Sequence, residues 1–151
     1  MNRTRAWTAA LLAAACGLLG ACAAGDKLPK PAAAPALIQN PGKPRLTVEE
    51  SDNGASVVLE RTQALIVRLP RRVADSAEWT PVDLRPDVLA VVSGPGFEPT
   101  PGDAVSGEPS GLSVWTLRAV GPGSVTLDFA LRRPHSRAPA LRSARYAVTV
   151  K

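Results

Sequence analysis

The chain has 151 residues, of which 45% are apolar and 21% are charged, and its formal net charge is +5. This balance argues against a disordered chain and against a polytopic membrane protein. The 15 Pro and 12 Gly favour turns and extended backbone over a helical bundle. With only 2 Cys and 1 His, the chain offers no disulfide scaffold, zinc site or Cys/His catalytic pair. We therefore expect no metal, no cofactor and no enzymatic activity.

Residues 1–21 are predicted to form a lipoprotein signal peptide. Arg3 and Arg5 make a basic start, and the apolar stretch that follows is too short to span a bilayer comfortably. It ends in Leu19-Gly20-Ala21-Cys22, which resembles the lipobox of bacterial lipoproteins. The resemblance implies that Cys22 is lipidated, and Ala23 after it favours the periplasmic face of the outer membrane. An ordinary secretory signal with a chance Cys is the alternative.

The segment that follows is predicted to be a spacer. Residues 22–45 contain the lipidated Cys and then recurring prolines without a periodic apolar face. Prolines of this kind favour an extended polyproline II tether. We therefore expect a lipid-anchored protein of the cell envelope whose folded domain covers residues 46–151.

In the domain itself, apolar residues recur with the two-residue period of β-strands. Turn signals such as Asn53-Gly54, Gly94-Pro95-Gly96 and Gly121-Pro122-Gly123 bound short apolar runs, and Pro81 indicates an edge strand or a bulge. Every second residue is apolar in the clearest runs, which are Leu65, Val67 and Leu69, then Val125, Leu127, Phe129 and Leu131, and finally Tyr146, Val148 and Val150. The pattern predicts an all-β fold, an immunoglobulin-like antiparallel β-sandwich of about seven to eight strands. A small closed barrel is the alternative.

Two tryptophans and a group of arginines are the remaining candidates for contacts. Trp115 lies in an alternating strand and is expected in the core, whereas Trp79 follows a polar loop, and a core or an interface position stays open for it. Five arginines fall between Arg132 and Arg145 with few aromatic residues among them. This composition favours a solvated loop or a contact with a protein over binding of nucleic acid.

The second half of the domain resembles a known family. The segment from Trp115 to Leu127 resembles the later strand pair of chagasin-type inhibitors of papain-like cysteine proteases. Arg132-Arg133-Pro134 follows where that family has an Arg-Pro-aromatic loop, with His135 at the aromatic position, and Leu65 to Pro70 resembles the strand before the first binding loop. The resemblance implies an immunoglobulin-like sandwich whose three loops at one end block the protease cleft without any catalytic group.

The resemblance also implies the protease-binding residues. They are Arg72, Asp75, Ser76 and Trp79 in the first loop, Gly107 and Gly111 in the second, and Arg133, Pro134 and His135 in the third. The partner would be a papain-like cysteine protease. The alternative is a non-inhibitory interaction domain that uses the same loops to bind another protein of the cell envelope.

Overall fold

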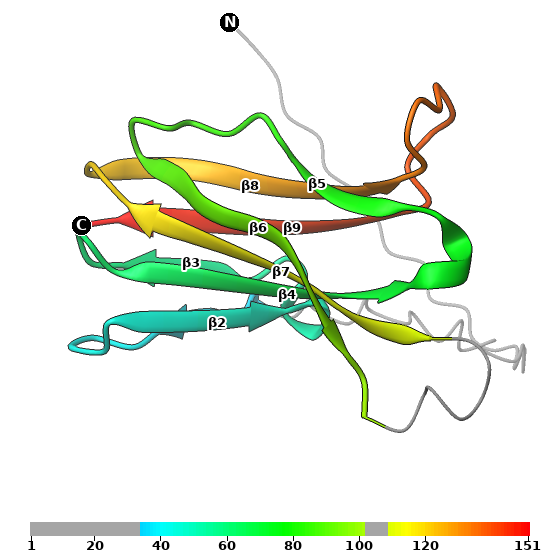
Figure 1. Ribbon diagram of the computed structural model, residues 1–151. Helices are drawn as coiled ribbons and strands as arrows, with labels where there is room; N and C mark the ends of the chain where they lie inside the picture. The colour runs from blue at the N-terminus through cyan, green and yellow to red at the C-terminus, as the bar shows by residue number, and fades with distance from the viewer. Residues whose placement is uncertain (1–33, 102–108) are drawn as a thin grey trace, which may run out of the picture. The chain divides into compact units, whose positions relative to one another are not determined.

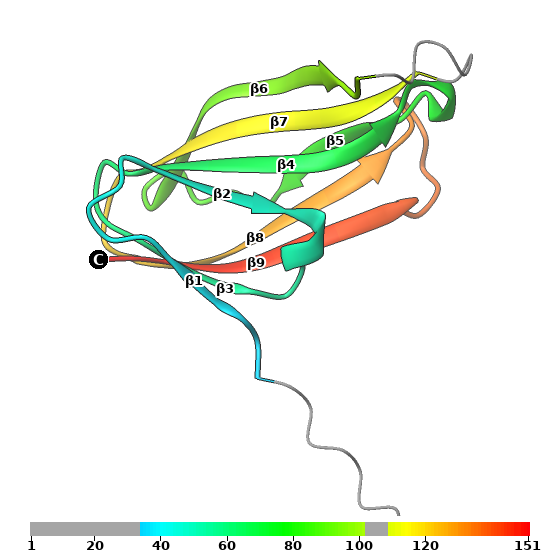
Figure 2. The ribbon, with the colours of Figure 1, turned by 90° about the horizontal axis from the view of Figure 1, so that it is seen from below.

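Short segments with alternating apolar residues form two β-sheets that pack face to face (Figure 1, Figure 2). The computed structural model describes residues 34–101 and 109–151, which belong to one unit, Ala33–Lys151. One sheet has the order β1 (Leu37–Gln39), β3 (Ser56–Leu59), β9 (Arg142–Val150), β8 (Gly123–Arg132) and β5 (Glu78–Val82). The other has the order β2 (Arg45–Glu49), β4 (Ala64–Arg72), β7 (Ser110–Ala119) and β6 (Leu89–Pro99).

The predicted all-β sandwich is confirmed. In the described part of the chain the only helical segments are two 3-10 turns, η1 (Glu50–Asp52) and η2 (Val73–Asp75). No helix among these residues is long and apolar enough to cross a membrane. Strand direction differs from the purely antiparallel expectation, because β1 and β3, β3 and β9, and β2 and β4 pair in parallel. The central pairs remain antiparallel, and β5 with its Pro81 lies at an edge as predicted.

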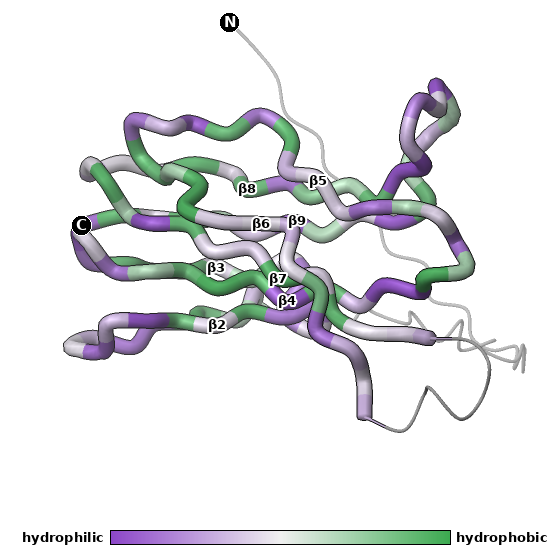
Figure 3. Tube along the Cα trace, viewed as in Figure 1, coloured by the Kyte–Doolittle hydropathy of each residue, from purple (hydrophilic) through white to green (hydrophobic). Residues whose placement is uncertain are grey.

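The core lies between the sheets and is built from the residues that alternate. Along β4, β8 and β9 the inward positions are almost fully buried, and apolar segments recur along the strands in Figure 3. The rings of Trp115 and Phe129 meet across the core with centroids 5.8 Å apart. Burial of apolar surface stabilises such a domain by roughly 25 cal/mol per Å². The alternation of apolar residues in the sequence therefore predicts which face of each strand is buried.

Two elements differ from the sequence prediction. Leu37–Gln39, placed in the tether, forms β1 at the edge of the five-stranded sheet, where Ile38 packs against the core. The folded unit thus begins before residue 46. The expected turn at Gly94 does not end β6, which continues to Pro99 through register shifts. Gly94 has φ +141°, and a Cβ there would lie 2.6 Å from the Trp115 ring, so the strand passes directly over that ring.

Two side chains connect the sheets by hydrogen bonds to main-chain oxygens. The Tyr146 hydroxyl on β9 donates to the Glu49 carbonyl at the end of β2, at 2.7 Å. The indole N–H of Trp79 on β5 donates to the Pro70 carbonyl on β4, at 2.9 Å. Both side chains are fully buried. Because each bond joins one sheet to the other, they set the position of one sheet relative to the other as well as their separation.

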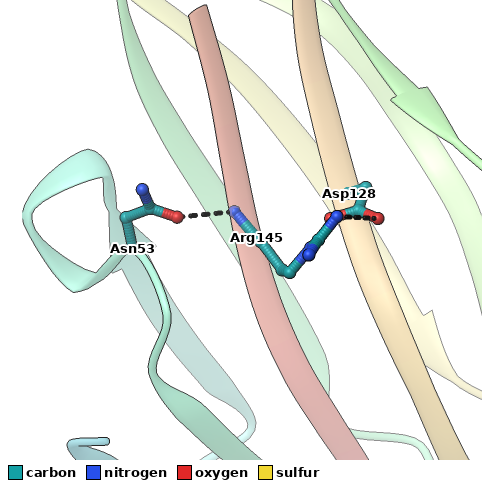
Figure 4. Close-up of polar contacts among 3 residues, drawn as sticks. All are labelled: Asn53, Asp128 and Arg145. Carbon is teal, nitrogen blue, oxygen red and sulfur yellow. Dashed lines mark hydrogen bonds and ion pairs between the residues drawn. The ribbon is translucent and has the colours of Figure 1, made fainter.

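The connection between η1 and β3 is held against β9 (Figure 4). The Arg145 amide donates to the Asn53 side-chain oxygen at 2.8 Å, and the Gly54 amide donates to the Arg145 carbonyl at 2.7 Å. The Arg145 guanidinium donates to both Asp128 oxygens, with its Nε 2.5 Å from Oδ1, and this carboxylate raises the pKa of Arg145. Arg145 therefore belongs to the scaffold and not to the free basic loop.

The hydroxyl of Tyr146 provides a first test. Tyr146→Phe leaves the Glu49 carbonyl without its donor, and we expect the free energy of unfolding to fall by about 1–2 kcal/mol. Urea denaturation measures this change. Thr126→Val, which alters an exposed residue of β8, is the control and should change stability by less than about 0.5 kcal/mol. Equal stability of Tyr146→Phe and the wild type would contradict the role of the bond.

Stability at alkaline pH should depend on the same residue. Burial, and then the charges of Asp52, Glu50 and Glu49, raise the pKa of Tyr146. The stabilisation is complete below the unfolded pKa of about 10 and is lost above it, by up to about 1.4 kcal/mol per pH unit. Since the chain has 1 Tyr, phenolate absorbance reports this group alone. Native protein that ionises near pH 10 would contradict the prediction.

Gly111 on β7 gives a second stability test. A Cβ there would touch the Glu98 carbonyl and lie 2.6 Å from the Phe97 ring, so Gly111→Ala must push β6 and β7 apart. We expect a loss of roughly 1–3 kcal/mol. At Gly96, on the neighbouring strand, the nearest atom would be 3.6 Å away, and Gly96→Ala should cost less than about 0.5 kcal/mol. Equal costs in thermal or urea unfolding would show that the close approach is unimportant.

Candidate loop interface

Three connections leave the sheets at the same end, which we call the loop end (Figure 1). The register sets this arrangement, because Arg72 pairs with Ser110, Pro99 with Gly111, and Glu78 with Arg132. The connections are residues 73–77, 100–109 and 133–141, here called the first, second and third loops. These are the three loops in which the sequence analysis placed its candidates, although residues 102–108, including Gly107, lie outside the described residues.

The first loop contacts both of the others. Its Val73 amide donates to the Pro109 carbonyl of the second loop at 3.0 Å. Its Asp75 carbonyl accepts a bond of 3.2 Å from Nε of Arg133, at the start of the third loop. Within the loop, Ser76 is exposed at φ +48°, and its amide donates to the Val73 carbonyl at 3.1 Å. The first loop is therefore the central one and is held from two sides.

The third loop presents three of the predicted residues to solvent. Arg133, Pro134 and His135 are all exposed, and His135 adopts the left-handed conformation, with φ +59°. The Ser136 amide donates to the Arg133 carbonyl at 3.2 Å, so the chain turns tightly at this point. Such a conformation is uncommon for a residue with a Cβ and places His135 at the apex of a turn.

Two predicted binding residues belong to the scaffold instead. Trp79 is fully buried, because the alternation of β5 turns it inward, and its indole N–H is bonded to Pro70. The prediction that Trp79 binds a protease was wrong, because a fully buried side chain cannot contact a partner. Gly111 lies buried in β7 and not in the second loop, where it allows the close approach of Phe97. Its contribution is to strand packing.

The charges at the loop end divide into paired and exposed groups. Nη1 of Arg71 lies 3.4 Å from Oε1 of Glu78, and the Arg71 guanidinium is 5.8 Å from the Phe97 ring centroid. The Arg142 guanidinium pairs with Glu50 and lies over the Trp79 ring. Arg72 precedes the first loop and is exposed, and Asp75 lies within the loop and is half-buried. The exposed side chains of Arg132 and Arg137 have no hydrogen-bond or ion-pair partner among the residues that the structure describes. The outer part of the loop end is therefore basic.

The sequence analysis missed the exposed apolar residues of the loop end. Val73 in the first loop is 42% exposed, and Leu141 at the end of the third is 49% exposed. Neither belongs to an alternating apolar run, so neither contributes to a strand period. A large apolar residue in a connection between strands was the available signal.

The arrangement of the described residues supports contact with another protein. No group of three or more His, Cys, Asp or Glu that could hold a metal ion occurs in residues 34–101 and 109–151. His135 is the only His of the chain and is exposed at a loop apex. The first loop is bonded to Pro109 and to Arg133, and basic and apolar side chains are exposed around these contacts.

Comparison with solved structures shows the same fold. The cysteine protease inhibitor EhICP2 of Entamoeba histolytica matches with a TM-score of 0.60 and 15% identity, over 71% of this chain and 95% of that one. Amebosin matches with a TM-score of 0.46 and 17% identity, over 78% of this chain and 100% of that one. PbICP-C, solved in complex with falcipain-2, matches with a TM-score of 0.44 and 11% identity, over 77% and 99%.

Sequence comparison assigns the family. No curated protein matches the chain. The profile described as "Chagasin family peptidase inhibitor I42" matches residues 58–150, which is more than half of the chain. Members of this family are inhibitors, so the prediction that the chain is not an enzyme is confirmed. The chain belongs to the chagasin family of peptidase inhibitors.

Proposed function

We propose that this protein inhibits papain-like cysteine proteases by placing the loop end in the active-site cleft. The observation that carries the proposal is the pair of contacts from the first loop, Val73 to Pro109 and Asp75 to Arg133, which join the three loops. Family membership and the shared fold with a cysteine protease inhibitor support it.

The loop end suits this role because hydrogen bonds hold its first loop in place before binding. Loops on a rigid scaffold lose less conformational entropy when they bind, so more of the contact energy appears as affinity. The Val73 amide is bonded to the Pro109 carbonyl, and the Asp75 carbonyl accepts from the Arg133 side chain. We assign it the central position in the cleft, with the exposed Val73 side chain as its apolar contact.

The other predicted residues take different roles in this proposal. Arg133 acts as a positioning residue, because its Nε holds the Asp75 carbonyl. Pro134 and His135 lie beyond it on the exposed turn and contact the protease directly. Arg72 precedes the first loop and Ser76 lies within it, and the side chains of both are exposed.

Inhibition of papain by variants of the full chain tests these roles. We expect Val73→Ser and His135→Ala each to raise the inhibition constant by about 10-fold or more, since a buried contact often contributes over 1.4 kcal/mol. Arg61→Ala, an exposed change at the opposite end of the sandwich, should alter it by less than twofold. Circular dichroism checks that each variant is folded.

The role of Arg133 can be tested by a substitution that keeps its charge. Arg133→Lys keeps the charge but cannot reproduce the Nε–H bond to Asp75, so we expect it to weaken inhibition nearly as much as Arg133→Ala. Lack of inhibition by folded wild-type protein, against papain and cathepsin-like enzymes alike, would contradict the proposal. Capture of another envelope protein through the same loops would then support the interaction-domain alternative.

We propose further that the domain is lipid-anchored through Cys22 at the periplasmic face of the outer membrane. The support is the Leu19-Gly20-Ala21-Cys22 motif and the Pro-rich segment after it, both outside the described residues. Several acyl chains anchor a protein firmly, whereas one chain alone binds weakly. The tether, shortened by β1, would hold the loop end free to meet a protease.

Cys22→Ala tests the anchor. In cells fed an alkyne fatty acid, the wild-type chain should carry the label and sediment with the outer membrane, and Cys22→Ala should carry none. Cys16→Ala is the matched control and should keep the label, because Cys16 would leave with the signal peptide. Equal labelling of the two variants, or no labelling of the wild type, would contradict lipidation at Cys22.

A further inference from the structure

A hollow lies on the outer face of the four-stranded sheet, toward the end opposite the loop end. Its volume is about 490 Å³, and it is distinct from the three loops. The strands β2, β4, β7 and β6 form its floor, as their order in the sheet requires (Figure 2). Its lining residues are Pro44, Arg45, Thr62, Ala64, Ile66, Val92, Ser93, Thr116 and Arg118.

Strand register places two arginines in one row of this hollow, on the two strands that flank β4. Arg45 pairs with Ala64, Ala64 pairs with Arg118, and Arg118 pairs with Ala90, so the four residues form one row across the sheet. Neighbouring strands are about 4.8 Å apart, which puts the backbones of Arg45 and Arg118 about 10 Å apart on the same face. The small Ala64 between them leaves the space over the row open.

Both guanidinium groups lack a partner in the described part of the chain. The side chains of Arg45 and Arg118 make no hydrogen bond or ion pair with residues 34–101 and 109–151, and no Asp or Glu lines the hollow. Arg68, on the same sheet face toward the loop end, is instead paired with Glu98. The acidic partners on this face are therefore found away from the hollow.

The remaining lining residues define the chemistry of a ligand. Thr62, Ser93 and Thr116 bring hydroxyl groups, which donate to anionic oxygens as guanidinium groups do. Ile66 and Val92 add apolar surface beside them. Two cations, several hydroxyls and an apolar wall suit a phosphate group attached to an organic body better than a small carboxylate.

We propose that this hollow is a binding site for phosphate groups, with Arg45 and Arg118 as the two cationic ligands. Phosphate presents oxygens to both sides of the hollow at once, so one anion can accept hydrogen bonds from both guanidinium groups. The source is either the phosphate of an anionic lipid headgroup or a free phosphate. The site is separate from the loop end and does not depend on the proposed inhibitory function.

Calorimetric titration of the full chain in a non-ionic detergent tests the site. The ligands are inorganic phosphate, short-chain phosphatidylglycerol, the zwitterionic phosphatidylcholine of equal chain length and acetate, all at constant ionic strength. We expect phosphate and phosphatidylglycerol to bind, and Arg45→Gln/Arg118→Gln to weaken both by at least about 10-fold. Arg137→Gln, an exposed change on the third loop, should alter them less than twofold.

The outcomes distinguish a lipid headgroup from free phosphate, and they show which results contradict the proposal. Phosphatidylglycerol that binds about 10-fold more tightly than inorganic phosphate assigns the site to lipid headgroups, and equal affinity assigns it to free phosphate. Acetate or phosphatidylcholine that binds as well as phosphate would overturn the proposal, as would no binding or unchanged affinity in the double variant. Papain inhibition by the double variant should equal that of the wild type, so the two functions are tested independently.

Discussion

The bond from the Trp79 indole to the Pro70 carbonyl is the interaction on which the loop end depends. It joins β5 of one sheet to β4 of the other, at the two sides of the first loop. The buried ring adds apolar contact and lies under the Arg142 guanidinium, which is also paired with Glu50. Without this bond, a loop that crosses from one sheet to the other could change its direction whenever the packing of the two sheets changed. Here its two ends are fixed by a side chain that the core holds in place.

Main-chain atoms carry much of the remaining support for the loops. The Val73 amide and the carbonyls of Asp75 and Pro109 take part in the contacts between loops, and only Arg133 contributes a side chain. Such contacts fix where a loop lies but leave most of its side chains unconstrained. This explains how His135 can stand at the position where the resemblance places an aromatic residue, while the contacts between the loops are kept.

The two ends of the sandwich differ in how their arginines are used. At the loop end, Arg71 and Arg142 are paired with carboxylates and stacked on rings, which leaves the loops themselves to face a partner. On the outer sheet face near the other end, Arg45 and Arg118 line a hollow that has no acidic residue. One domain can therefore present a protein-binding surface at one end and an anion-binding surface near the other.

The sequence by itself determined the strand faces and the edge at Pro81, because alternation records which side of each strand is apolar. The three loops came from the family resemblance carried by the sequence. Only the tertiary structure decided that Trp79 is buried, that Leu37–Gln39 joins a sheet and that β6 continues past Gly94. It alone put Arg45 and Arg118 in one row on either side of Ala64, and Arg133 beside Asp75. The physical reason is that pairing between strands distant in the chain is set by register and by packing of the two sheets, and a local pattern contains neither.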